Sequence, residues 1–136
     1  MGISDDYKDF NMPLFIEKGD KTPEIELNRR KGLLLFQGNS YPENAEEFYA
    51  PVLKWLNSYI KYPKDITVAK FQIEYVNSTS ARIFYHILNM LEKLYSLGYE
   101  VFIEWYYEED DEDIYGKGAD LSEKCQIPFH FYKLQH

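Results

Sequence analysis

The chain has 136 residues, of which 45% are apolar, so length and composition suit a single domain, residues 1–136, with one core. The formal net charge is −8, and the only basic cluster, residues 18–31, is diluted by Asp20, Glu24 and Glu26. Because phosphate groups are bound by clustered Lys and Arg, we expect neither nucleic acid nor an anionic membrane as a partner. A single cysteine, Cys125, excludes an internal disulfide and a cysteine-rich metal site.

The sequence contains no recognisable signal for secretion or for membrane insertion. No apolar run approaches the ~18 residues that a membrane-spanning helix needs. Residues 1–11 are polar and acidic, unlike a secretory signal peptide. We therefore expect a soluble cytoplasmic protein, with no direct membrane insertion, whose residues 1–11 form a flexible leader.

The first half of the chain predicts a β-hairpin and then a helix. Residues 14–16 suit a short edge strand, and the alternating residues 22–27, the turn residues 28–32 and the apolar run 33–36 predict two antiparallel strands. Ser40 and Glu43 have the spacing of a helix capping box. Apolar residues then recur at helical spacing, so we expect a helix over residues 43–60, kinked or split at Pro51.

The second half alternates strands with helices. Residues 66–76 are rich in β-branched and aromatic side chains, which is typical of a central strand. An apolar repeat of three and four residues predicts a helix over residues 81–97, ended by Gly98. A strand over 99–107, a short helix over 120–124 and a strand over 127–134 follow. This order predicts an α/β (α+β) fold, a mixed β-sheet with an N-terminal hairpin and two main helices packed on it.

Four small polar residues separate the central strand from the second main helix: Asn77, Ser78, Thr79 and Ser80. A helix start leaves backbone N–H groups without partners, and a cap by Asn77 or Ser78 alone would satisfy them. Capping is the commoner use of such residues, but it does not require three hydroxyls. A phosphate here would face free N–H groups and the positive end of the helix dipole, and Arg82 is placed to pair with it. The turn is therefore a candidate phosphorylation site.

Other candidate sites are weaker. An EF-hand loop that starts at Asp111 would place Tyr115 and Ser122 at ligand positions, so the acidic run 108–113 predicts a solvated loop and no metal site. His86, His130 and Cys125 belong to no catalytic or cofactor motif, and we expect no catalytic residue and no cofactor. A small enzyme that uses His86 or His130 with the acidic loop is the least favoured alternative.

Three segments together resemble the SiaC family of bacterial regulatory phosphoproteins. They are residues 38–44 (GNSYPEN), residues 74–80 (EYVNSTS), and residues 104–107 (EWYY) with 125–129 (CQIPF). Their order and spacing cover most of the chain, from about Thr22 to His130. The resemblance implies a STAS-like domain, similar to anti-sigma-factor antagonists, with a phosphorylatable hydroxyl at a strand-to-helix turn.

The resemblance also implies a non-enzymatic signalling switch. A serine/threonine kinase adds the phosphate and a phosphatase removes it. The unphosphorylated form binds and activates a diguanylate cyclase, or another regulatory target, and so controls cyclic-di-GMP and biofilm or aggregation. The family's acceptor follows the first Asn of an Asn-Thr-Ser-Ser motif, which corresponds to Ser78. Because this chain has Asn-Ser-Thr-Ser, Thr79 remains an alternative acceptor and Ser80 a weaker one.

The partner-binding face implied by this resemblance consists of Asn77, Ser78, Thr79, Ser80 and Arg82. The alternative is a constitutive protein-interaction module or subunit, in which the turn only caps a helix and no phosphorylation switch exists.

Overall fold

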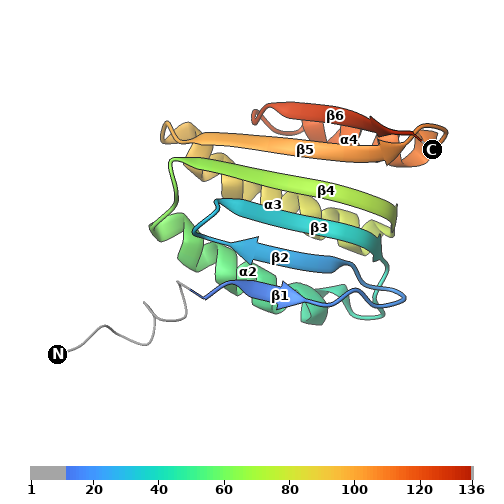
Figure 1. Ribbon diagram of the computed structural model, residues 1–136, viewed down its shortest axis with the longest axis horizontal. Helices are drawn as coiled ribbons and strands as arrows, with labels where there is room; N and C mark the ends of the chain where they lie inside the picture. The colour runs from blue at the N-terminus through green and yellow to red at the C-terminus, as the bar shows by residue number, and fades with distance from the viewer. Residues whose placement is uncertain (1–11, 136) are drawn as a thin grey trace.

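The computed structural model describes residues 12–135, so the expected leader, residues 1–11, lies outside the described range. Within that range the chain forms one six-stranded sheet and three helices (Figure 1). The strands are β1 (Leu14–Ile16), β2 (Glu24–Asn28), β3 (Leu33–Ser40), β4 (Ile66–Val76), β5 (Glu100–Glu108) and β6 (Phe129–Leu134). The helices are α2 (Ala45–Lys61), α3 (Ser78–Ser96) and α4 (Glu112–Glu123).

The strands lie in the sheet in the order in which they occur in the chain. β1, β2 and β3 pair antiparallel, whereas β3, β4, β5 and β6 pair parallel. Each parallel pair is joined by a helix, and right-handed crossovers between neighbouring strands place all such helices on one face. Figure 1 shows the helices behind the sheet. The predicted mixed sheet with an N-terminal hairpin and covering helices is confirmed.

The core lies between the helices and the alternate residues of the strands that face them. Phe36, Phe71 and Trp105 are paired across β3, β4 and β5 and stack, with ring centroids 4.8 Å and 5.6 Å apart. Phe84 of α3 packs on Phe71 at 5.2 Å. Each such buried ring stabilises the fold by roughly 1.5–3 kcal/mol. This contact fixes α3 over the centre of the sheet and places its first turn at the carboxyl end of β4.

Two helices begin earlier than their patterns predict. α3 begins at Ser78 rather than at residue 81, because Asn77 caps it and the hydroxyl residues form its first turn. α4 begins at Glu112 rather than at residue 120, and the Asp111 side chain accepts a hydrogen bond from the Ile114 N–H at 3.0 Å. The acidic run therefore caps a helix and complements its positive end instead of forming only a solvated loop.

The predicted capping box at Ser40 and Glu43 is wrong. The cap of α2 is Asn44, which accepts from the Glu47 N–H at 3.1 Å and donates to the Glu47 carboxylate at 3.4 Å. Ser40 is instead the buried last residue of β3. α2 also continues past Pro51 without a break to Lys61, so the helix is not split there.

Candidate functional site

The site begins where β4 ends. On β4 the pairing with β3 moves from Gly38–Ile73 to Asn39–Tyr75, so Glu74 is an extra residue in the strand. Such a bulge interrupts the alternation of side chains. Tyr75, at a position that strict alternation would place in the core, is 49% exposed, and Val76 is buried. The bulge thus presents Tyr75 on the surface immediately before the hydroxyl turn.

Asn77 is the N-cap of α3. Its side-chain oxygen accepts a hydrogen bond from the Ser80 N–H at 2.9 Å, and its carbonyl accepts from the Ala81 N–H at 2.9 Å. Its own N–H donates to the Ser40 carbonyl at 3.0 Å. The requirement for a cap is therefore met by Asn77, and the hydroxyls of Ser78 and Thr79 are not needed for it.

The three consecutive hydroxyls differ sharply in accessibility. Ser78 is exposed, Thr79 is half-buried and Ser80 is fully buried at 0% exposure. The Thr79 hydroxyl accepts a long hydrogen bond from the Arg82 guanidinium at 3.5 Å. Among residues 12–135, no group hydrogen-bonds to the Ser78 hydroxyl. Ser78 therefore carries the most accessible of the three hydroxyls.

Ser80 belongs to a buried chain of hydroxyls that sequence reasoning did not find. Ser40 donates to the Ser80 hydroxyl at 2.8 Å and lies 2.6 Å from the Tyr49 hydroxyl, which must then be the donor to Ser40. Burial raises the pKa of Tyr49. The chain joins the ends of β3 and α3 to α2, so Ser80 has a structural role. No local signal marks it, because Ser40 and Ser80 are far apart in the sequence.

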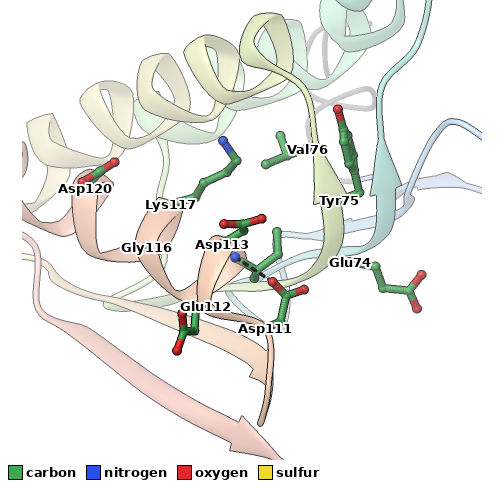
Figure 2. Close-up of a pocket in the computed structure, with 10 residues that line it drawn as sticks. Glu74, Tyr75, Val76, Asp111, Glu112, Asp113, Gly116, Lys117 and Asp120 are labelled. Atoms are coloured by element: carbon green, nitrogen blue, oxygen red, sulfur yellow. Dashed lines mark hydrogen bonds between the residues drawn. The ribbon is translucent and has the colours of Figure 1, made fainter.

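An acidic groove of about 600 Å³ lies beside the turn, between the end of β4 and the start of α4 (Figure 2). Carboxylates dominate its wall, and Lys117 is the one cation among its lining residues, which are Glu74, Tyr75, Val76, Asp111, Glu112, Asp113, Ile114, Gly116, Lys117 and Asp120. At its rim, Tyr75 meets Tyr41 edge-on, with ring centroids 5.4 Å apart, and both rings are exposed. The end of β4 therefore places an aromatic pair and an acidic groove beside the turn that contains Arg82 and the hydroxyls.

The histidines and the cysteine considered for catalysis do not line the acidic groove, whereas the acidic residues considered for metal binding do. His86 is exposed on α3, and His130 on β6 packs against Phe102. Burial, with a smaller contribution from Glu92, raises the pKa of Cys125, and a backbone hydrogen bond from Ile127 acts in the opposite direction. Within residues 12–135, no three His, Cys, Asp or Glu side chains are grouped so that they would hold a metal ion.

Comparison with known proteins identifies the family. A family model described as "SiaC family regulatory phosphoprotein" matches residues 16–134. The chain belongs to the SiaC family. It is accordingly a regulatory protein and not itself an enzyme. Over residues 12–135, none of the helices is long and apolar enough to cross a membrane.

Relatives from Pseudomonas aeruginosa support the assignment to the SiaC family. The uncharacterized protein PA14_02130 of strain UCBPP-PA14 is 28% identical over 116 residues, which is 85% of this chain and 92% of that protein. The crystal structure of the diguanylate cyclase SiaD with its activator SiaC matches with a TM-score of 0.84 and 27% identity, over 89% of this chain and 99% of the matched one. The crystal structure of apo-SiaC matches with a TM-score of 0.82 and 27% identity, over 89% and 98%.

Proposed function

We propose that this SiaC family member is a cytoplasmic signalling switch whose unphosphorylated form binds and activates a diguanylate cyclase. The output would be cyclic-di-GMP and, through it, biofilm formation or aggregation. The observation that carries the switch is the Ser78 hydroxyl, which is exposed at the first turn of α3 while Asn77 supplies the cap. The likeness to SiaC, the activator in a complex with SiaD, supports the choice of a cyclase as partner.

A serine/threonine kinase would modify Ser78, and a phosphatase would reverse the reaction. The Ser78 oxygen attacks the γ-phosphorus of a nucleoside triphosphate. The bond between this phosphorus and the oxygen that bridges it to the β-phosphate breaks, and the nucleoside diphosphate leaves. The hydroxyl proton passes to a base of the kinase. In the reverse direction, water displaces the phosphoryl group as inorganic phosphate and restores the hydroxyl.

The added charge explains why binding would be lost. A phosphoserine carries about −1.5 to −2 charges near neutral pH. The phosphate would lie beside the carboxylates of the acidic groove. It would also lie on the surface that binds the partner when the turn is uncharged. Bringing a charge into a desolvated interface costs about 2–5 kcal/mol unless the partner compensates that charge. At about 1.4 kcal/mol for each tenfold change, this weakens binding by tens to thousands of times.

Mass spectrometry of the protein purified from its native host tests the switch. Trypsin should release a peptide of residues 71–82, which holds all three hydroxyls. We expect a fraction of this peptide to carry one phosphoryl group, and fragment ions to place it on Ser78 rather than on Thr79. A peptide that stays unmodified in every growth state would contradict the switch and favour the alternative, a constitutive interaction module.

A further inference from the structure

Two cations from different helices, Arg82 and Lys117, lie near the end of β4 and the start of α3. Arg82 follows Ser78 by four residues, so both lie on one face of α3, and its guanidinium reaches back to the Thr79 hydroxyl. Lys117 comes from α4 and lines the acidic groove together with Val76. In Figure 2 the Lys117 side chain points toward Val76, at the end of β4. Arg82 thus contacts the first turn of α3, and Lys117 lies by the strand residue that precedes this turn.

Arg82 and Lys117 both line a second cavity, although only Lys117 lines the acidic groove. This second cavity has a volume of about 180 Å³, lies between α3 and α4, and includes Ala81, Arg82 and Lys117 in its wall. Val76 and Ala81, which flank the hydroxyl turn in sequence, both line it. Within residues 12–135, neither Arg82 nor Lys117 forms an ion pair, although carboxylates crowd the adjoining groove. The ion pairs of this range join Lys21 to Glu43, Lys31 to Glu26 and Lys70 to Glu104.

We propose that Arg82 and Lys117 together bind the phosphoryl group of modified Ser78, so that phosphorylation ties the first turn of α3 to α4. This inference rests on the proposed phosphorylation of Ser78. A guanidinium offers paired N–H donors to phosphate oxygens, and an ammonium adds a compact charge. The modified serine would then be held within the crevice between the two helices, and it would close that crevice to a partner.

Five carboxylates oppose this arrangement. They line the neighbouring groove and belong to Glu74, Asp111, Glu112, Asp113 and Asp120, and Asp120 also lines the cavity between α3 and α4. Like charges raise the pKa of a phosphate, and opposite charges in contact lower it. Charges that water separates from the phosphate are screened more than charges in direct contact with it. The sign of the change in phosphate pKa therefore reports whether the cations or the carboxylates are its nearest neighbours.

The test is phosphorus NMR on the full chain with phosphoserine incorporated at position 78 during translation, so that no kinase is required. We expect a second phosphate pKa below the ordinary value of about 6 by about half a pH unit or more. Arg82→Gln and Lys117→Gln should each raise that pKa toward the ordinary value. Lys124→Gln is the matched control, because Lys124 lines the same cavity but lies over the Tyr85 ring, 5.7 Å from its centroid. This control should leave the phosphate pKa unchanged.

Two results would overturn the inference. One is a phosphate pKa at or above the ordinary value in the parent protein, and the other is a pKa that responds to Arg82→Gln but not to Lys117→Gln. Both are separate from the test of the proposed function, since the phosphoserine is incorporated during translation without a kinase. A protein that is never phosphorylated in its host would count against the switch, whatever the NMR titration shows.

Discussion

Ser78, Thr79 and Ser80 carry nearly the same chemical group, yet their surroundings give them different roles. Ser80 is buried and accepts a hydrogen bond from Ser40. The Thr79 hydroxyl accepts a hydrogen bond from the Arg82 guanidinium, and Ser78 faces solvent. The difference arises because α3 begins at Ser78, which turns successive side chains by about 100° around the helix axis. Side chains of the same kind are thereby divided between core and surface.

A charge at position 78 should weaken binding of the partner. We expect Ser78→Asp to reduce the affinity for the cognate diguanylate cyclase by tens of times or more, because the carboxylate imitates part of the phosphate charge. Ser78→Ala should bind as the parent protein does, and Thr79→Ala is a second control. Titration calorimetry with the purified cyclase measures the affinities. Equal affinity of Ser78→Asp and Ser78→Ala, with both proteins folded, would refute the docking role of this turn.

Ser80 should matter for stability rather than for signalling. Ser80→Ala removes the acceptor of the buried Ser40 hydroxyl, and an unsatisfied buried group costs about 1–3 kcal/mol. The free energy of unfolding, measured by urea denaturation, should fall by that amount. Ser78→Ala should change it by less than about 0.5 kcal/mol, since an exposed side chain is replaced. Equal effects of the two substitutions would show that the buried hydroxyl chain adds nothing.

At the scale of single elements, the packing of α4 on the sheet depends on one residue, Gly118. A Cβ atom at Gly118 would lie 2.5 Å from the Trp105 ring, so only glycine lets α4 pack this closely on β5. The Trp105 indole N–H also donates to the Ile114 carbonyl at 3.0 Å. Lys117 and the acidic residues of the groove are held in place by this contact.

The two glycines of α4 should respond in opposite ways to alanine. Gly118→Ala should destabilise the fold by about 1–3 kcal/mol, because the added methyl overpacks the Trp105 contact. Gly116→Ala should stabilise it by about 0.5–1 kcal/mol, because nothing lies within 4 Å of its added Cβ and alanine favours a helix interior. Thermal unfolding of both variants measures the difference. A neutral Gly118→Ala would show that α4 adjusts freely on the sheet.

At the scale of the whole molecule, the three helices cover one face of the sheet, and no other element in residues 12–135 covers the opposite face. Burial is deepest in the central strands and falls toward the edges. β4 contains fully buried side chains along its length, whereas β1 and β6 contain none. The turn that carries Ser78 is therefore attached to one of the well-buried central strands.

Hydrogen exchange should follow this gradient. We expect the amides of β4 and of the neighbouring parts of β3 and β5 to exchange most slowly, because they open only on global unfolding. The amides of β1 and β6 should exchange first, as the two edge strands. Exchange followed by mass spectrometry with peptide resolution measures this. Protection in β6 equal to that in β4 would contradict the gradient.

Much of this architecture could be predicted from the sequence, since apolar periodicity marks the order of strands and helices and places the hydroxyl turn between β4 and α3. The start of α4 was missed because Gly116 and Gly118 weaken a helical pattern, and the need for glycine arises from Trp105 on another strand. The partners of Ser40 were missed for a similar reason. They depend on the packing of α2 and α3 against the end of β3, which local patterns do not reveal.

The extra residue at Glu74 also determines where β4 tolerates a change in length. Elsewhere in the strand, a single-residue deletion would move every following side chain to the opposite face of the sheet. At Glu74 it would not, because Glu74 and Tyr75 both point outward and only one of them is paired with β3. Relatives that lack one residue here can therefore keep Val76 in the core and Asn77 at the start of α3, with only the groove wall shortened.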